Sequence, residues 1–285
     1  MVFQDESAAI PKEKVPFAEQ VERYRVPPGG RVTLADYPPD PSEPLKRGRA
    51  QKLLKRLRKQ LNTLQELLYA TGDRAVLVVL QGMDTSGKDG VIKRVVSAFN
   101  PQGFEVSGFK VPTPEELAHD FLWRVHARVP RRGMVGVFNR SHYEDVLVVR
   151  VDGLVPEPVW RQRYAAIREF EALLAANGVV IVKFFLNISK EEQAARLRDR
   201  LEDPTEHWKF RTGDLSARAK WDAYMAAYEA ALEECSPPEA PWYVVPANSK
   251  TYRDAVIAQV LVNRLEALQM EWPPLPADSS HIVIE

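Results

Sequence analysis

Short apolar runs and amphipathic segments alternate along this chain. Residues 74–82, 133–141, 178–189 and 240–248 are rich in β-branched and aromatic residues, and such continuous runs are typical of strands buried on both faces. A less apolar strand is predicted at 104–111. Because about five strands alternate with helical segments, the sequence predicts a three-layer α/β fold around a central parallel sheet.

Helices are predicted where apolar residues recur every three or four positions. The clearest helix lies between Leu45 and Tyr69 and ends near Gly72. One of its faces is apolar and consists of Leu53, Leu57, Leu61, Leu64 and Leu68. Further helices are predicted over residues 87–100, 113–129, about 158–176, 190–203, 220–234 and 252–268. Residues 203–218 are polar and irregular.

Three regions of the chain differ in composition. Residues 1–44 are rich in proline and charge and are predicted to form an extended N-terminal arm. Residues 45–270 carry the alternating pattern and are predicted to form one domain. Residues 271–285 are proline-rich and are predicted to form a C-terminal tail.

The charges of the chain balance, with 39 basic and 39 acidic residues. A binding site for a polyanion must therefore come from local clustering of charge. One such cluster lies between Lys46 and Lys59, which holds eight basic residues and no acid. For this cluster, an ordinary solvated helix face is slightly favoured over a polyanion contact. A nucleic-acid-binding protein is not favoured, since the net charge is zero and no nucleic-acid module is recognisable.

The rest of the composition predicts a soluble cytoplasmic protein. The first residues contain acids and no apolar core, so they do not resemble a secretory signal. No apolar run approaches the length that spans a bilayer. The single cysteine, Cys235, excludes a disulfide framework and a cysteine-based metal site.

The strongest chemical signal is the segment GMDTSGKD between a predicted strand and a predicted helix. Gly82, Gly87 and Lys88 match the pattern G-x-x-x-x-G-K, in which backbone N–H groups and the helix N-terminus hold phosphate. Asp89 stands where this pattern normally has Ser or Thr, and Asp84 adds a second acid. Asp89 could bind a metal or complement the helix dipole, whereas Asp84 is expected to hold a metal, to accept a proton from an attacking phosphate, or to orient an acceptor.

A second set of polar residues follows the strand predicted at 133–141. Asn139 could position a metal-bound water, and the guanidinium of Arg140 is suited to phosphate oxygens. Glu144 and Asp145 follow about one helical turn later, where they are either part of the site or a solvated, capping pair.

Five segments in order resemble the type-2 polyphosphate kinase family: GMDTSGKDG, FKVPTPEELAHDFLWRVH, GVFNRSHYEDVLVVRV, HWKFRTGDL and APWYVVPAN. The resemblance runs from about Tyr24 to the C-terminus. It implies a P-loop kinase fold with a helical lid at about 196–218, and a reversible transfer of phosphate from polyphosphate to AMP and ADP with Mg²⁺ or Mn²⁺. It implies adenine nucleotides as partners, leaves guanine nucleotides open, and implies a homo-oligomer, a dimer or a tetramer.

The resemblance also assigns roles to individual residues. The catalytic residues it implies are Asp84, Lys88, Asn139 and Arg140. The metal ligands are Asp84, Asp89 and Asn139. The residues implied in phosphate or nucleotide binding are Gly82, Gly87, Asp89, Gly90, Glu144, Asp145, Arg200, Lys209 and Arg211. Three basic residues near the family segments are expected along the polyphosphate channel, namely Lys110, Arg124 and Arg128.

Two other functions remain compatible with the phosphate loop. An ATP-dependent nucleoside monophosphate kinase shares the loop and an arginine-rich lid, although Asp89 and the pair Asn139–Arg140 argue against it. A non-catalytic nucleotide-binding module would bind without turnover, and the presence of Asp84, Lys88 and Arg140 argues against that. The leucine face of residues 53–68 could pack on its own sheet or on another subunit.

Overall fold

A parallel five-stranded sheet forms the centre of the computed structural model, which describes residues 16–275. The strands follow the order β2-β3-β1-β4-β5 across the sheet. Their bounds are Ala75–Gln81 for β1, Phe104–Gly108 for β2, Val135–Asn139 for β3, Val179–Asn187 for β4 and Trp242–Pro246 for β5. All five predicted strands are therefore present, and the predicted α/β fold with a parallel sheet is confirmed.

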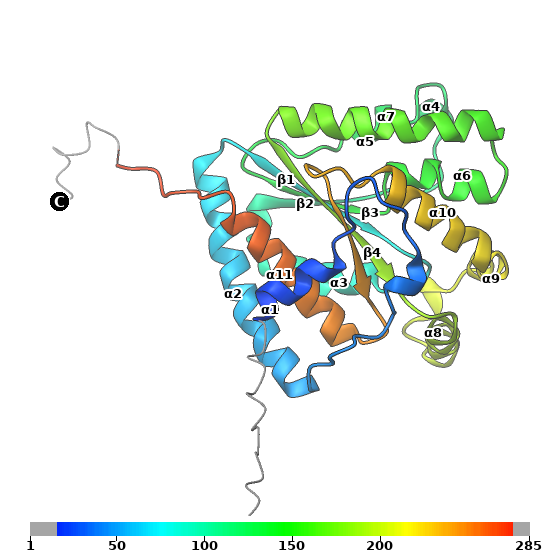
Figure 1. Cartoon of the computed structure of the whole chain (residues 1–285), viewed down its shortest axis with the longest axis horizontal. Helices are drawn as coiled ribbons and strands as arrows, with labels where there is room; N and C mark the ends of the chain where they lie inside the picture. Colours follow the sequence, from blue (N-terminus) through cyan, green and yellow to red (C-terminus); the bar gives the residue numbers. More distant parts are fainter. Residues whose placement is uncertain (1–15, 276–285) are drawn as a thin grey trace, which may run out of the picture.

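Helices cover both faces of this sheet (Figure 1). One face is covered by α2 (Arg47–Thr71), α3 (Lys88–Arg94) and α11 (Lys250–Glu266), and the other by α7 (Glu157–Ala176) and α10 (Trp221–Glu234). The remaining helices are α1 (Phe17–Gln20), α4 (Pro114–Leu117), α5 (Trp123–His126), α6 (Val148–Val151), α8 (Lys190–Glu202) and α9 (Thr212–Ala219). The two outer layers and the sheet give the three-layer arrangement expected from the sequence.

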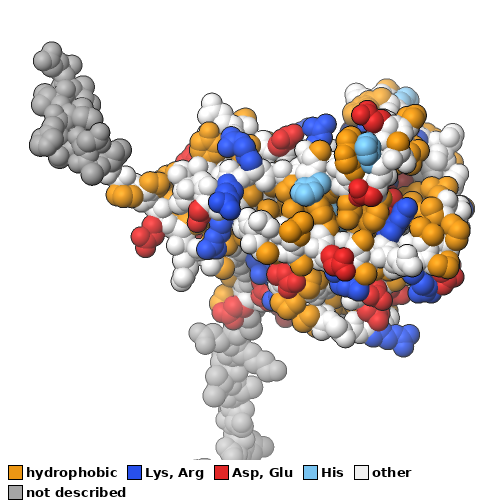
Figure 2. Space-filling view, turned by 90° about the horizontal axis from the view of Figure 1, so that it is seen from above, with side chains coloured by type: hydrophobic (Ala, Val, Ile, Leu, Met, Phe, Trp, Pro, Cys, Tyr) orange, Lys and Arg blue, Asp and Glu red, His pale blue; other side chains and the backbone are white. Residues whose placement is uncertain are grey.

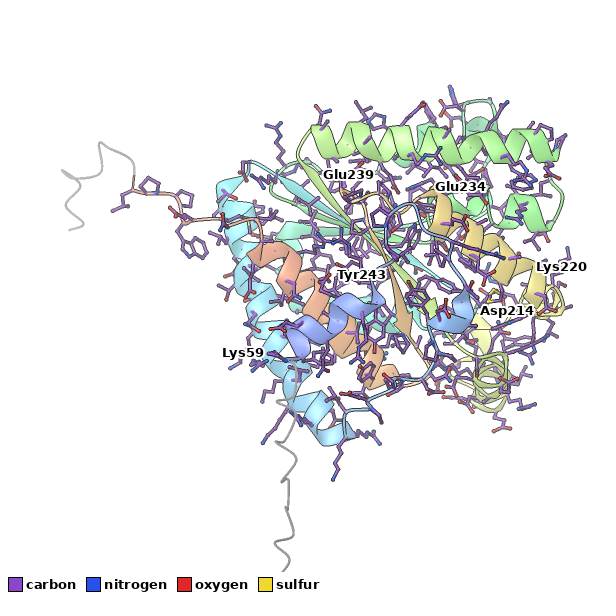
Figure 3. All side chains as sticks on the ribbon, in the orientation of Figure 1. Lys59, Asp214, Lys220, Glu234, Glu239 and Tyr243 are labelled. Carbon is purple, nitrogen blue, oxygen red and sulfur yellow. The ribbon has the colours of Figure 1, made fainter. Side chains whose placement is uncertain are left out.

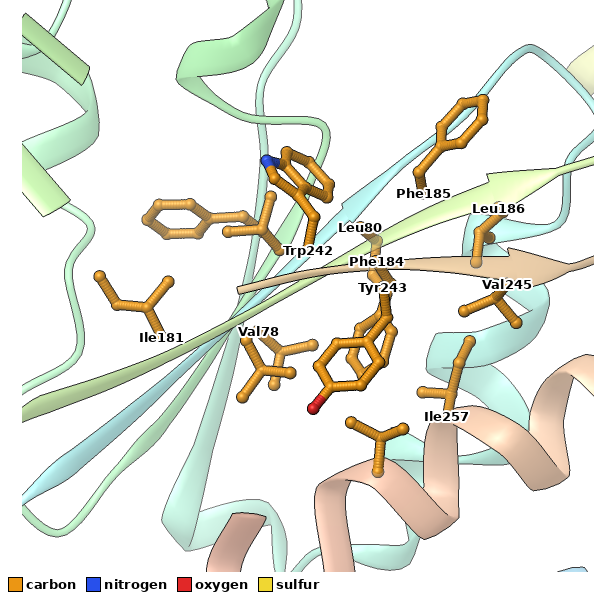
Figure 4. Close-up of a cluster of buried hydrophobic side chains, with 14 of the residues drawn as sticks. Val78, Leu80, Ile181, Phe184, Phe185, Leu186, Trp242, Tyr243, Val245 and Ile257 are labelled. Atoms are coloured by element: carbon orange, nitrogen blue, oxygen red, sulfur yellow. The ribbon is translucent and has the colours of Figure 1, made fainter. Parts of the chain in front are cut away.

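The core is built from side chains that alternate between the two faces of the central strands. Phe184 and Phe185 project to opposite sides of β4 (Figure 4). On one side Phe184 packs beside Tyr243, with ring centroids 5.8 Å apart, and on the other Phe185 packs against Tyr228 of α10 at 4.3 Å. The three central strands β3, β1 and β4 are covered on both faces and are mostly apolar, as expected for a parallel sheet, whereas the edge strand β2 is more polar and largely exposed.

Two helices are shorter than the sequence predicts. The helix expected over 87–100 ends at Arg94. The carbonyl of Arg94 accepts a hydrogen bond from Arg58 Nη1 (2.7 Å), and the N–H of Ala98, its partner in a continued helix, donates to the carbonyl of Val95. The helix expected over 113–129 begins with the predicted cap but is divided into α4 and α5. At the break, the carboxylate of Asp120 accepts from the backbone N–H of Leu122 (2.9 Å), which favours a turn.

The described part of the N-terminal arm belongs to the core. The backbone N–H of Val26 donates to the carbonyl of Trp242 (2.9 Å), so the arm covers the free edge of β5. The hydroxyls of Tyr24 and Tyr252 are 2.9 Å apart, and Val21 and Val26 are fully buried. This part of the arm contains α1 and two 3₁₀ helices, Val21–Tyr24 and Leu34–Asp36, and it lies on the sheet edge rather than apart from the domain. Residues 1–15 and 276–285 lie outside the described residues.

The surface carries charges of both signs. On the face shown in Figure 2, basic and acidic side chains are interspersed with hydrophobic ones, in keeping with a formal net charge of zero. Within residues 16–275, none of the helices has the length and apolar character that crossing a membrane requires.

The leucine face of α2 packs mainly against α11 of the same chain. Leu57, Leu61 and Leu68 are fully buried, whereas Leu53 and Leu64 are partly buried, so most of this face is covered within the chain. The association expected from the family resemblance stays a prediction.

Replacing Leu61 by alanine is expected to lower the free energy of unfolding by about 2–5 kcal/mol, because the substitution leaves a cavity between α2 and α11. Chemical denaturation would measure this loss, if the slope of the unfolding free energy against denaturant concentration is the same for the variant and the wild type. Leu173→Ala, at a position 53% exposed on α7, is the matched control and should change stability by less than about 0.5 kcal/mol. Equal losses for the two variants would contradict the described packing.

Candidate functional site

The segment between β1 and α3 forms a tight loop around the amino group of Lys88. Lys88 Nζ is buried and donates to the carbonyls of Gly82 (2.6 Å) and Met83 (3.3 Å). Gly87 has a φ of 102°, and a Cβ at this position would lie 1.9 Å from Arg253 Nη1. Glycine is therefore required at position 87 both by the backbone conformation and by the side chain behind it.

Two arginines hold this loop from the protein side. Arg196 of α8 donates to the carbonyls of Thr85 (2.9 Å) and Ser86 (3.2 Å), and also to two carbonyls after β5. Arg253 of α11 is fully buried and donates to the carbonyl of Ser86 (2.9 Å). Asp254 accepts from Arg253 at 2.7 Å, which compensates its buried charge.

The sequence reasoning did not assign a role to either arginine. A signal was present for Arg253, since the adjacent pair Arg253–Asp254 directly precedes the mostly apolar run AVIAQVLV. For Arg196 there was no comparable signal, because it lies in a helix that is rich in charge along its whole length.

The polar residues after β3 lie beside the phosphate loop, because β1 and β3 are neighbours in the sheet and pair in parallel. Arg140 Nη2 donates to Asp84 Oδ1 (2.7 Å), and its Nη1 donates to Glu144 Oε2 (3.2 Å). Asn139 Nδ2 donates to Asp89 Oδ1 (2.7 Å). The structure thus brings together the residues that the sequence placed in two separate motifs.

Opposite charges are closely balanced around Lys88. Burial and the neighbouring Arg140 lower the pKa of Lys88 to about 8, although three nearby carboxylates oppose this shift. The pKa of Arg140 is raised, chiefly by Glu144 and further by Asp84. A bound phosphate would favour the charged form of Lys88, because an adjacent anion stabilises an ammonium group.

These residues open into a cleft of about 1090 Å³ at the carboxyl ends of the strands. The cleft is also lined by most of the other residues that the sequence singled out: Gly87, Gly90, Lys110, Arg124, Asp145, Arg200, Lys209 and Arg211. Gly82 lies below it, where its carbonyl meets Lys88. Arg128 lies outside its lining; its side chain is 61% exposed and faces Glu105 at 3.9 Å.

One wall of the cleft is formed by α8, the 3₁₀ helix His207–Lys209 and α9. Asp214 of α9, labelled at the right of Figure 3, accepts from Arg200 at 3.4 Å. Lys209 pairs with Glu206 at 2.5 Å, and Trp208 between them is 77% exposed. The segment predicted as a lid therefore borders the phosphate loop with basic side chains.

The opposite wall of the cleft carries two more paired arginines. Arg124 is buried and donates to the carbonyl of Lys110 (2.8 Å), which fixes the loop after β2. Arg163, which the sequence reasoning did not single out, donates to Asp145 Oδ1 (2.8 Å). Burial raises the pKa of Asp145, while Arg163 and Arg124 act against this rise. Basic groups thus face the cleft from both walls.

A buried polar cluster supports the loop after β3 from behind. Glu171 of α7 and Lys183 of β4 form an ion pair, and both are fully buried. Tyr143 donates to Glu171 (2.9 Å) and accepts from Lys183 (2.8 Å), while His142 Nε2 lies 3.2 Å from Glu171. His142 and Tyr143 follow Arg140 almost directly, so this cluster fixes the backbone that presents Arg140 and Glu144.

The residues present fit a divalent cation that is shared with a substrate. Within residues 16–275, no group of three or more His, Cys, Asp and Glu side chains is arranged to hold a metal ion. Asp84, Asp89 and Asn139 nevertheless supply oxygen atoms at the base of the cleft. Mg²⁺ is commonly bound by one or two carboxylates, water and substrate phosphates, and this set of residues meets that requirement.

Cys235 does not act as a nucleophile in this arrangement. Its thiol is fully buried, and burial raises its pKa to about 12. The thiol is therefore protonated at neutral pH, and Cys235 does not line the cleft.

Removing one partner of the buried pair should destabilise the protein strongly. Glu171→Gln or Lys183→Met is expected to cost about 3–5 kcal/mol, because either change leaves a buried charge without its partner. The double variant Glu171→Gln/Lys183→Met should cost less than the sum of the two single variants, and urea unfolding would measure all three. Additive losses would show that the two charges do not depend on each other.

Comparisons with known proteins agree with this geometry. Residues 44–273 match the family model described as polyphosphate kinase 2. The chain is 53% identical to an AMP/ADP-polyphosphate phosphotransferase of Meiothermus ruber, over 93% of this chain and all of that protein. It is 45% identical to an ADP-polyphosphate phosphotransferase of Rhodopseudomonas palustris, over 89% and 92% of the two chains.

A solved structure extends the similarity to three dimensions. The crystal structure of polyphosphate kinase 2 from Arthrobacter aurescens TC1 superimposes with a TM-score of 0.87 at 46% identity, covering 91% of this chain and 94% of that one. The family model covers most of the chain and the identities to whole relatives are high. The chain therefore belongs to the polyphosphate kinase 2 family.

Proposed function

We propose that this protein transfers phosphoryl groups from inorganic polyphosphate to AMP and to ADP, reversibly. The observation that carries the proposal is the cleft in which Lys88 and Arg140 lie among Asp84, Asp89 and Glu144. The names of the relatives support the substrates, since the protein from Meiothermus ruber is named for polyphosphate and for both nucleotides.

The donor phosphate would be held by the loop and by Lys88. In the free protein, Lys88 Nζ is bonded to carbonyls of its own loop. A phosphate oxygen offers this ammonium a charged acceptor, and charge-assisted hydrogen bonds are stronger than those to neutral carbonyls. Arg140, about 38% exposed and directed at Asp84, would contact the group in transfer from the other side.

In the transfer step, an oxygen of the acceptor's terminal phosphate forms a new P–O bond with the donor's terminal phosphorus. The P–O bond to the rest of the polyphosphate breaks, which leaves a chain shorter by one phosphate. The acceptor phosphate has lost most of its protons at neutral pH, because its second pKa is about 6. The reaction thus needs positioning and charge neutralisation, rather than a covalent intermediate on the protein.

We propose that Mg²⁺ or Mn²⁺ is held by Asp84, Asp89 and Asn139 together with substrate oxygens. When bound, such an ion neutralises charge on the phosphates and orients them. Asp84 has a second role in the free protein, since it pairs with Arg140 and thereby keeps this side chain at the cleft. Asp89 is fixed in a similar way by Asn139.

The walls of the cleft supply the remaining contacts in this proposal. Arg200, Lys209 and Arg211 on one wall would neutralise phosphates as the lid approaches them. Lys110 and Arg124 on the other wall would contact the polyphosphate chain. Exclusion of water by the lid would strengthen these interactions and reduce hydrolysis of the donor.

The proposal is tested by supplying purified protein with long-chain polyphosphate, Mg²⁺ and AMP, and following nucleotides by chromatography. The expected result is ADP first and ATP afterwards, because one cleft serves both acceptors. If ADP formed and no ATP followed, ADP would not be an acceptor. No product from polyphosphate, with turnover when ATP replaces it, would instead assign the protein to nucleotide-donor kinases.

Asp84→Asn is expected to reduce kcat about 10²-fold and to raise the Mg²⁺ concentration that gives half-maximal activity. The substitution keeps the size of the side chain but removes the charge that both a metal and Arg140 require. Initial rates measured over a range of Mg²⁺ concentrations would separate these effects.

Asp152→Asn is a matched control for this variant, because Asp152 pairs with Lys220 on the surface. It should leave kcat and the Mg²⁺ dependence unchanged. If Asp84→Asn lowered kcat without changing the Mg²⁺ dependence, Asp84 would act only through Arg140 and not as a metal ligand.

A further inference from the structure

The first half of α2 borders a groove of about 520 Å³ that lies outside the catalytic cleft. Lys55, Arg58 and Lys59 line it on one side, and Ser97 and Ala98 line it on the other. Apart from Leu54, the α2 residues along it are polar or basic, and it contains no carboxylate. A groove of this composition fits an extended anion rather than an apolar ligand.

The basic residues of this helix differ from those of the cleft in one respect. In the cleft, Arg140, Arg163, Arg200 and Lys209 are each paired with an acid of the protein. Among the described residues, none of the eight basic side chains between positions 46 and 59 forms an ion pair. Their mutual repulsion therefore lacks internal compensation, and an external polyanion would relieve it.

The groove is connected to the cleft by the segment that starts at the phosphate loop. Gly90 and Arg94 of α3 line the cleft, and Ser97 and Ala98, about one turn further, line the groove. The bond from Arg58 Nη1 to the carbonyl of Arg94 (2.7 Å) holds α2 against this segment. Arg94 itself is about 40% exposed, so a cation lies between the two binding surfaces.

We propose that this groove is a second subsite for polyphosphate, which holds a distant part of the chain whose end lies in the cleft. This inference rests on the proposed function, because it requires a polyphosphate donor. Lys55 and Lys59 are one turn apart on α2 and exposed, so both ammonium groups can contact successive phosphates (Lys59 is labelled in Figure 3). Since only a long chain reaches both surfaces, the groove would favour long donors over short ones.

The decisive variant is Lys55→Ala/Lys59→Ala, which removes two charges from the groove at exposed positions of α2, where alanine favours the helix. We expect KM for long-chain polyphosphate to rise about 5- to 10-fold at low salt, with kcat unchanged. The variant should bind linear tetrapolyphosphate with the same affinity as the wild type. This short chain can be used as the donor or as a competitor of the long donor. The affinity for the long chain should also depend less on salt. In a plot of log affinity against log salt concentration, the slope should become shallower by about 0.7 for each lost contact.

A matched control lies on the same helix. Lys52→Ala/Arg56→Ala removes the same charge at the same spacing from exposed positions that do not line the groove. This control should change KM for the long chain less than twofold, and Lys55→Arg/Lys59→Arg should restore the wild-type value. Equal effects of the groove variant and the control, or no effect of either, would overturn the subsite.

Binding of fluorescent long-chain polyphosphate without nucleotide separates this inference from the proposed function. If the wild type bound and used polyphosphate while the groove variant behaved like the control, only the subsite would be wrong. If the wild type turned over no polyphosphate of any length, the proposed function would fail. Tighter binding of a single-stranded RNA of equal charge to the same lysines would assign the groove to a different partner and overturn the inference.

Discussion

The site depends on how the backbone of the phosphate loop is held. A loop that turns tightly around an ammonium group exposes carbonyl oxygens that the protein interior must satisfy. Arg196 and Arg253, from two different helices, donate to the carbonyls of Thr85 and Ser86. Asp254 compensates Arg253 and also pairs with Arg94 of α3. Through these bonds, α8 and α11 fix the position of a loop that belongs to neither of them.

The two carboxylates in the loop have a physical explanation in the free protein. Lys88 and Arg140 lie close enough that each would raise the energy of the other's charge. Asp84, Asp89 and Glu144 offset this repulsion, and Asp84 and Glu144 also hold the guanidinium of Arg140 in place. The acids thus allow the cations to be arranged in advance. Preorganised charge is effective in catalysis because little reorganisation remains for the transition state.

The sequence predicted the strands and the phosphate loop well, because both depend on local patterns. Apolar runs identify buried parallel strands, and the glycine spacing identifies the turn before Lys88. It did not predict the early end of α3, since that end depends on Arg58, thirty-six residues before the carbonyl it binds. Arg196, Arg253 and the cluster around Glu171 were missed for the same reason: their roles come from contacts between distant elements. The burial of the arm rests on a few apolar residues within a proline-rich segment, which gave no periodic signal.

The contact between the arm and β5 bears on how the protein folds during synthesis. The hydroxyls of Tyr24 and Tyr252, which lie 2.9 Å apart, are separated by 228 positions in the chain. The edge of the sheet therefore closes only after the segment holding β5 and the start of α11 has left the ribosome. Until then Val21, Tyr24 and Val26 have no place to be buried. Contacts of such long range slow folding and prolong the exposure of apolar surface, so the growing chain would be most prone to aggregation just before its last strand forms.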